Sequence, residues 1–480
     1  MGTGNKHRSP FIIVLGTLII LISLSFVDTV FSWNGFTFKP MDVIAEIREA
    51  APAKAKAPGK RKHPRKFKKD TVNIADSARL NQTDSTAQDE DIAPVNPFPS
   101  RDFTTYKGII NYFQPGYEQN GLQHFLDALL QLQHKKRGKV RIAYFGDSMI
   151  EGDLITMDLR DSLQTYFGGN GVGFVPITSV VSSFRTSIIH TYSSDWKDFH
   201  FKNDRPDTLL LGISGHSFEG EAGSWVKYRA VNRPHLNHFE KAQLLYSKIY
   251  GNASVTVNNG TPLKLSGNYA VNMLNIPMAP KQTSLNMVFD MEPGNELYGM
   301  CFEGDSGIVL DNFSFRGISG IELGKLQPAM LKSLQAKRPY DLIVLHYGAN
   351  VLFKPELTDY DWFARPMKRV IASLHETFPD ASFLIVGTAD KSYKKDGFYV
   401  TAPGVQPLIT VQNEIAQEHG FAFWSLFNAM GGNGSMTKWV EADTSLANKD
   451  YTHFNARGAR KVAGLLYKAI MDEYKQAEKY

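Results

Sequence analysis

The stretch VRIAYFGDSMIEGD, Val140–Asp153, decides the fold of this chain. Its first half is a continuous apolar run, which is typical of a strand that is buried on both faces of a parallel sheet. The run stops at Gly146, and a serine follows two residues later. After that serine, LITMDLRDSLQTYF carries apolar residues at helical spacing. A strand, a tight turn and a helix together bring the side chain of Ser148 to the carboxyl edge of a sheet.

The same alternation of apolar strands and amphipathic helices recurs later in the chain. DLIVLHY, SFLIVGTA and FAFWSLF are apolar runs that start at Asp341, Ser382 and Phe421, and WFARPMKRVIASLHETF between the first two has a helical pattern. Upstream, GLQHFLDALLQLQHKK also has apolar residues at three- and four-residue intervals. We therefore predict an α/β fold, a three-layer α/β/α sandwich with a parallel sheet.

Residues 191–311 interrupt this alternation. ASVTVNNGTPLKL places apolar residues at alternate positions on both sides of an Asn-Gly turn, and SLNMVFDM alternates again. Both patterns are typical of antiparallel hairpins, and helical periodicity nearly vanishes here. We predict an all-β insertion, a β-sandwich, which divides the α/β domain into residues 101–190 and 312–480.

An apolar run near the N-terminus, Phe11–Val27, is about long enough to cross a bilayer. Lys6 and Arg8 precede it and no small-residue cleavage motif follows, so residues 1–32 are predicted to be a cytoplasmic tip and an uncleaved membrane anchor. A removed signal peptide and a buried core helix are the alternatives. Cys301 is the only cysteine, and folding without disulfides is ordinary in the bacterial periplasm. We expect inner-membrane anchoring with the catalytic domain in the periplasm.

Residues 33–100 are predicted to be a disordered linker, first basic and then acidic. APAKAKAPGKRKHPRKFKKD, which starts at Ala51, holds nine lysines and arginines among proline, alanine and glycine. The formal net charge of +5 therefore comes from the linker and not from the folded part. The charges do not lie on a predicted folded face, so nucleic-acid binding is not predicted. Attraction to anionic lipid or wall polymer is a further hypothesis.

Two later segments carry residues that would complete a catalytic site around Ser148. A serine hydroxyl needs a base and a carboxylate that orients the base. NKDYTHFNARGARKV places Asp450 and His453 three residues apart, before the last predicted helix. HYGANVLF ends a strand near Asn350, and FRGISGIEL offers the backbone N–H of Gly320. These groups and the N–H of Ser148 are candidate oxyanion donors. Each motif is weak alone, since Asp-x-x-His is often a helix cap.

The order of these motifs resembles that of the SGNH, or GDSL-type, hydrolases. Within that superfamily the chain resembles the bacterial peptidoglycan O-acetylesterases, which are exported and carry a carbohydrate-binding β module inserted after the serine block. The similarity spans about Lys139 to Ile470 and is carried by GDSMIEGDLITMDLRDSLQTYFGGNGVGFV, RGISGIEL and FWSLFNAMGGNGSMTKWV. The inserted domain would bind carbohydrate by this resemblance, which assigns no residue of it.

The resemblance implies roles for the candidate residues. Ser148 would attack the ester, His453 would act first as base and then as acid, and Asp450 would orient His453. Ser148, Gly320 and Asn350 would form the oxyanion hole. The implied activity is removal of O-acetyl groups from peptidoglycan or a related cell-envelope polysaccharide. No cofactor and no metal are expected, because the histidines lack ligand spacing.

The sequence departs from the family pattern at three positions. Met149 stands where the family usually has histidine, Ser319 replaces an asparagine, and Val351 replaces a carboxylate near the oxyanion asparagine. Such changes could alter substrate preference or the balance between water and another acceptor. Asp147 is expected to fix the serine turn by hydrogen bonds, and His346 is expected to be a core residue or a residue behind the site.

Two other functions stay open. The acetyl-enzyme could pass its acetyl group to a sugar hydroxyl, in partnership with a membrane acyltransferase beside the anchor. The chain could also be a non-catalytic wall-binding protein, although the intact Ser148, Asp450 and His453 argue against this. The expected partners are a cell-wall polysaccharide and the inner membrane, without nucleic acid.

Overall fold

The computed structural model describes residues 101–113, 121–203, 205–206 and 208–479, and the backbone of two short strands, β1 (Phe31–Trp33) and β2 (Phe36–Phe38). β1 and β2 pair antiparallel, with Phe31 opposite Phe38. β2 and Trp33 of β1 lie inside the range 33–100 that is predicted to be a disordered linker. FSWNGFTF alternates aromatic and polar residues around an Asn-Gly pair, which is a hairpin signal.

The predicted anchor Phe11–Val27 and the rest of the predicted linker lie outside the described residues. Within the part of the chain that the structure describes, no helix has both the length and the apolar character needed to cross a bilayer. The segment from Glu90 onward forms one compact unit.

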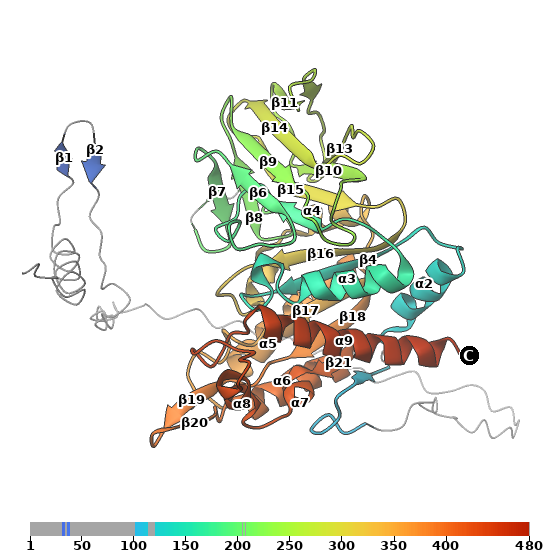
Figure 1. The fold of residues 1–480 in the computed structure, drawn as a ribbon, viewed down its shortest axis with the longest axis vertical. Coiled ribbons are helices and arrows are strands. Elements are labelled where there is room, and N and C mark those ends of the chain that lie inside the picture. The colour runs from blue at the N-terminus through green and yellow to red at the C-terminus, as the bar shows by residue number, and fades with distance from the viewer. Residues whose placement is uncertain are drawn as a thin grey trace, which may run out of the picture. The chain divides into compact units, whose positions relative to one another are not determined.

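A six-stranded sheet lies at the centre of this unit (Figure 1). In spatial order its strands are β16 (Gly307–Ser314), β4 (Lys139–Gly146), β17 (Leu342–His346), β18 (Ser382–Gly387), β21 (Ala422–Ser425) and β3 (Ile109–Asn111). The first five strands are parallel, and β3 pairs antiparallel with β21 at the edge. Every residue of β17 and β18 is buried, as expected for strands covered on both faces.

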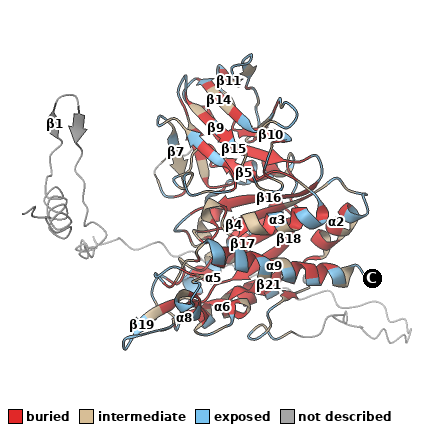
Figure 2. Ribbon diagram, viewed as in Figure 1, coloured by how far each residue is buried: buried red, intermediate tan, exposed pale blue. Residues whose placement is uncertain are grey.

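Helices cover both faces of this sheet, so the predicted three-layer α/β/α architecture is present (Figures 1 and 2). Successive residues of β4 face opposite layers. Ile142 and Tyr144 lie in one core with α2 (Gln123–Gln133), α3 (Thr156–Phe167) and α9 (Ala456–Ala477). Ala143 and Phe145 lie in another with α4 (Pro328–Gln335), α5 (Asp361–Thr377) and α6 (Val405–Glu418).

Short elements connect these layers. They are the 3-10 helices η1 (Glu151–Asp153) and η2 (Ile321–Lys325), the helices α7 (Leu426–Met430) and α8 (Ser435–Glu441), and the hairpin of β19 (Ser392–Lys395) and β20 (Phe398–Thr401). The predicted strand at Phe421 ends at Ser425, because the hydroxyl of Ser425 accepts the N–H of Asn428 and begins α7.

Two antiparallel sheets stand between α3 and β16 in the chain. One contains β13 (Asn272–Ile276), β10 (Lys241–Tyr246), β15 (Glu296–Glu303), β8 (His216–Glu219) and β7 (Lys197–His200), with β5 (Gly173–Pro176) paired to β15. The other contains β12 (Leu263–Lys264), β11 (Ala253–Val257), β14 (Ser284–Met291), β9 (Trp225–Arg229) and β6 (Ile189–Tyr192). Apolar residues of both sheets share one core, including Leu244 and Phe302 of the first and Val226 and Phe289 of the second.

The antiparallel region differs in its limits from the predicted 191–311. It starts with β5 at Gly173 and ends with β15 at Glu303, since β16 pairs in parallel with β4. A buried ion-pair network joins the two regions. The guanidinium of Arg338, which is 1% exposed, donates to Glu303 at 2.8 Å and to Asp311 of β16 at 3.0 Å. The β-sandwich is therefore held to the central sheet by an ion pair from which water is excluded.

Candidate active site

The nucleophile turn follows β4 directly. A side chain at Gly146 would put its Cβ atom 2.9 Å from the side chain of Ile150 and 3.0 Å from the carbonyl oxygen of His346, so the strand end requires glycine. The carboxylate of Asp147 accepts the N–H of Met149 at 2.9 Å and closes the turn, as predicted. Asp147 is fully buried, and burial raises its pKa to about 6 although its hydrogen bonds act in the opposite direction. Ser148 is thereby presented at the carboxyl edge of the sheet.

Ser148, His453 and Asp450 form a continuous hydrogen-bonded chain. The hydroxyl of Ser148 lies 2.8 Å from His453 Nε2, and His453 Nδ1 lies 2.8 Å from Asp450 Oδ2. Asp450 also accepts the backbone N–H of His453 at 3.0 Å. With the Nδ1 proton directed at the carboxylate, Nε2 is free to accept the serine proton. The arrangement is that of a serine nucleophile with its base and its orienting carboxylate.

The charges of this chain suit that role. Partial burial raises the pKa of Asp450, but the hydrogen bonds from His453 and Thr452 outweigh it and lower the pKa to about 2. The hydrogen bond to Asp450 raises the pKa of His453, while burial acts in the opposite direction. Asp450 is therefore a carboxylate at neutral pH and stabilises the imidazolium that forms when His453 takes a proton.

The segment that carries Asp450 and His453 is a turn and not a helix cap. Tyr451 has a φ of 54°, and the N–H of Asn448 donates to the carbonyl of His453 at 2.8 Å. The cap of α9 is Asn455, whose side chain accepts the N–H groups of the first helical turn. Because Asn455 caps the helix, the carboxylate of Asp450 is available to orient the imidazole of His453.

Asn350 contacts the nucleophile turn, and Gly320 lies beside Tyr347, three residues before Asn350. Gly320 has a φ of 96°, and a Cβ atom there would lie 2.7 Å from the ring of Tyr347. The Asn350 amide donates to Asp147 Oδ2 at 3.0 Å and to the carbonyl of Ile318 at 3.1 Å. Both amide hydrogens of Asn350 are therefore engaged. By contrast, no hydrogen bond among the described residues uses the backbone N–H of Ser148 or that of Gly320.

Of the three positions that depart from the family pattern, two are buried apolar residues and the third forms hydrogen bonds within its own turn. Met149 and Val351 are buried in the two cores that cover the sheet. The hydroxyl and the N–H of Ser319 both donate to the carboxylate of Glu322. His346 is buried beside Tyr144, and burial lowers its pKa to about 4, so it is a core residue as predicted.

Lys391 is a further residue of the site that the sequence analysis does not identify. Its ammonium group donates to the carbonyls of Leu352 at 2.8 Å and Ala349 at 3.3 Å, on the loop that carries Asn350. Burial lowers its pKa, while the carboxylates of Asp450 and Asp147 act in the opposite direction. The only sequence signal is a lysine just after the apolar strand SFLIVGTA. Such a position is shared by many surface lysines.

Comparison with known proteins relates this geometry to a known fold. No family model and no curated protein matches the chain. Among solved structures, a peptidoglycan O-acetylesterase has a TM-score of 0.65 at 21% identity and covers 77% of this chain and 99% of its own. Two other matches are weaker. A family two carbohydrate esterase from Clostridium thermocellum has a TM-score of 0.26 at 11% identity and covers 55% of this chain and 98% of its own. A lipase/acylhydrolase from Enterococcus faecalis has a TM-score of 0.25 at 16% identity and covers 35% of this chain and 78% of its own. The chain has an SGNH hydrolase-type fold, in agreement with the order of its motifs.

Proposed function

We propose that this protein is a serine ester hydrolase that removes O-acetyl groups from peptidoglycan or a related cell-envelope polysaccharide. The observation that carries the proposal is the unbroken chain from Ser148 through His453 to Asp450, with 2.8 Å at both links. These three polar side chains come from two distant segments and meet at the end of β4, where Ser148 is partly exposed. They lie in the order that nucleophilic catalysis by a serine requires.

The geometry supports a two-step acyl transfer to water. As Ser148 Oγ attacks the acetyl carbonyl carbon, its proton passes to His453 Nε2. The tetrahedral intermediate then collapses, the bond from the carbonyl carbon to the sugar oxygen breaks, and that oxygen takes the proton from Nε2. Water attacks the acetyl-enzyme with Nε2 again as base, which releases acetate and restores Ser148.

The backbone N–H groups of Ser148 and Gly320 are the two donors that are ready to bind the oxyanion. Asn350 would join them by turning one amide hydrogen from Ile318 or Asp147 toward the developing charge, as the tetrahedral intermediate forms. Catalytic hydrogen bonds often tighten only in the complex with substrate, so the engaged amide is compatible with this third donor.

The substrate class is supported by three observations. The solved structure with a TM-score of 0.65 is that of a peptidoglycan O-acetylesterase. The β-sandwich is inserted after the serine block, where that family carries a carbohydrate-binding module. The resemblance of FWSLFNAMGGNGSMTKWV to the same family points to the same class of substrate.

The cellular location forms part of the proposal. The protein would be anchored in the inner membrane by Phe11–Val27, with the catalytic domain in the periplasm. Cell fractionation should recover the full chain with membranes, and protease added to spheroplasts should digest the catalytic domain. Recovery in the cytosol would refute this location.

Acetate release by the full chain from O-acetylated peptidoglycan tests the function directly. Ser148→Ala should abolish release, whereas Ser254→Ala in β11 of the β-sandwich should leave it unchanged. Release that survives Ser148→Ala would refute the assignment of the nucleophile. If the chain hydrolyses 4-nitrophenyl acetate but releases no acetate from the polymer, transfer to a sugar hydroxyl with a membrane acyltransferase partner becomes the better proposal.

A further inference from the structure

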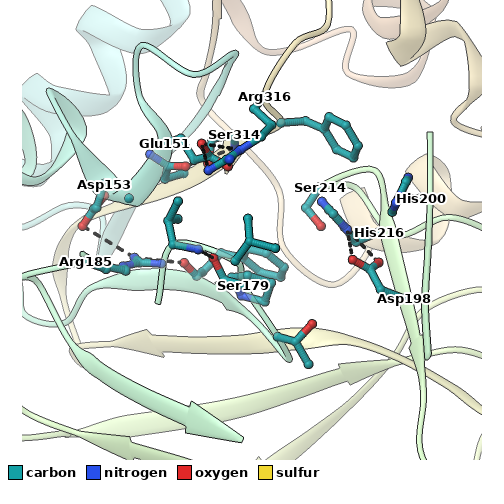
Figure 3. Close-up of a pocket in the computed structure, with 18 of the residues that line it drawn as sticks. Glu151, Asp153, Ser179, Arg185, Asp198, His200, Ser214, His216, Ser314 and Arg316 are labelled. Carbon is teal, nitrogen blue, oxygen red and sulfur yellow. Dashed lines mark hydrogen bonds and ion pairs between the residues drawn. The ribbon is translucent and has the colours of Figure 1, made fainter. Parts of the chain in front are cut away.

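A cavity of about 310 Å³ lies between the α/β domain and the β-sandwich, next to residues 151–153, which follow the nucleophile turn (Figure 3). Its walls include Glu151 from the segment after the nucleophile, Ser314 and Arg316 from the end of β16, and His200 and His216 from β7 and β8. The volume is at the lower end of the range of small-molecule sites, about 300–1,000 Å³. The catalytic mechanism assigns no role to this cavity.

The cavity shares its walls with the two loops of the candidate active site. Ser314 pairs with Gly146 at the ends of the parallel strands β16 and β4, so this wall of the cavity lies at the sheet edge that carries the nucleophile turn. The guanidinium of Arg316 donates to the carboxylate of Glu151 at 2.7 and 2.8 Å. This ion pair links the segment after Ser148 to the segment that leads to Gly320. A ligand in the cavity would therefore contact the segments that follow Ser148 and precede Gly320 in the chain.

One wall presents the ring edge of a fixed histidine. The ring of His216 stacks with Phe218 and with Phe315, whose ring centroids are 5.7 and 4.7 Å away at interplanar angles of 3° and 28°. Its Nδ1 atom lies 2.8 Å from Asp198 Oδ1. Since Nδ1 is engaged by Asp198, Nε2 is the remaining polar atom, and in the neutral ring it is a hydrogen-bond acceptor.

A second histidine supplies the complementary group. His200 Nδ1 accepts the backbone N–H of Lys202 at 3.2 Å, so the neutral ring carries its proton on Nε2. Burial lowers the pKa of His200, which favours this neutral form. The rings of His200 and His216 are 5.7 Å apart, and neither Nε2 atom has a partner among the described residues. A donor and an acceptor on the paired strands β7 and β8 can together bind hydroxyl groups of one sugar ring.

The charges around the cavity are balanced. Each lining carboxylate has a cation or histidine beside it: Glu151 pairs with Arg316, Asp153 with Arg185 at 3.5 Å, and Asp198 with His216. The remaining cation, Lys202, donates to the carbonyl of Arg316 at 3.0 Å. Such a lining favours a neutral polar ligand over a free phosphate or a uronate.

We propose that this cavity binds one neutral glycosyl unit of the polysaccharide whose ester reaches Ser148. The proposal rests on the proposed function for the identity of the polymer, and it adds the site that holds the sugar. His216 accepts a hydroxyl proton, His200 donates to a sugar oxygen, and Phe315 provides an apolar surface beside them. Bound in this way, the glycan would be oriented before acetyl transfer to Ser148.

Direct binding tests the site independently of turnover. The full chain is titrated calorimetrically with chitotetraose, a neutral tetramer of N-acetylglucosamine, and with tetragalacturonate, an anionic tetramer. We expect saturable binding of chitotetraose that is weakened about tenfold by His216→Phe, which keeps the stacked ring and removes the Nε2 acceptor. The matched control His134→Phe changes an exposed histidine at the end of α2 and should leave the affinity unchanged.

Kinetics provide the second test. The ratio of kcat/KM for acetate release from O-acetylated peptidoglycan to kcat/KM for 4-nitrophenyl acetate should fall about tenfold in His216→Phe, since only the polymer reaches the cavity. A ratio that does not change would overturn the proposal. So would the absence of saturable chitotetraose binding, equal binding by His216→Phe, or tighter binding of tetragalacturonate.

The two tests also separate this proposal from the proposed function. If the chain binds chitotetraose through His216 but releases no acetate from any glycan, the sugar site is supported and the esterase function fails. If acetate is released and His216→Phe changes neither binding nor the kinetic ratio, the function stands and the sugar site fails.

Discussion

Asn350→Ala separates the catalytic and structural roles of one side chain. In the structure the Asn350 amide donates to the fully buried carboxylate of Asp147 and to the carbonyl of Ile318. A hydrogen bond to a charged group contributes about 1.5–3 kcal/mol and one to a neutral carbonyl about 0.5–1.5 kcal/mol. The substitution should therefore lower the free energy of unfolding by roughly 2–4 kcal/mol. If Asn350 also binds the oxyanion, kcat should fall by about 10² to 10³.

The assay measures both quantities on the same variant, with urea unfolding for stability and 4-nitrophenyl acetate for kcat. The matched control is Asn428→Ala. The Asn428 amide also donates two hydrogen bonds, to the carbonyls of Phe103 at 2.8 Å and Tyr106 at 3.0 Å, and it is not part of the catalytic chain. The control should lose stability with little change in kcat. If Asn350→Ala behaves in the same way, the oxyanion role of Asn350 is refuted and the backbone N–H groups of Ser148 and Gly320 suffice.

Three further predictions concern protonation, positioning and stability. The hydrogen bond to Asp450 raises the pKa of His453 above its usual 6.5, so kcat/KM for 4-nitrophenyl acetate should fall tenfold per pH unit below that pKa. Asp450→Asn should move this acid limb of the pH profile to lower pH and should lower kcat. An acid limb that does not move would contradict the pairing of Asp450 with His453. Lys391→Met removes a cation that lowers the pKa of His453, so the limb should move to higher pH, a shift that loosened packing alone would not produce. Arg338→Met removes the cation that pairs with the buried Asp311, which keeps only a hydrogen bond from Tyr340, and it should lower the free energy of unfolding by about 3–5 kcal/mol in urea. The exposed Arg365→Met should have little effect, and equal losses would argue against the buried network.

Much of the site could be predicted from the sequence, because strand ends and chain order determine it. Ser148 and His453 are separated by 305 positions, yet the rule that parallel strands end at one edge brings the predicted residues together. The engagement of Asn350 by Asp147 could not be predicted, since it depends on the rotamer of an amide between two loops. Lys391 was missed for a similar reason, because a lysine after a strand carries no pattern of its own.

The sugar-binding cavity also could not be predicted. His200 and His216 are separated by a loop, and both rings pack against Phe315, which belongs to the other domain, His200 edge-to-face and His216 stacked. The limits of the β-sandwich were displaced for a different reason. GIVLDNFS is apolar throughout its first half and could extend an antiparallel sheet or begin a parallel one, and only its pairing with β4 decides between them.

The buried contact of Arg338 with Glu303 and Asp311 has a consequence for the products of the reaction. Since this contact fixes the β-sandwich to the central sheet, the bound sugar and Ser148 are separated by a constant length of glycan. If the protein acts as proposed, it would remove acetyl groups only from sugar residues at a fixed distance along the glycan from the bound sugar. Acetyl groups at other distances would remain. The partly digested polymer should then carry a regular pattern of remaining acetyl groups, where a flexible tether between the two domains would leave a random one.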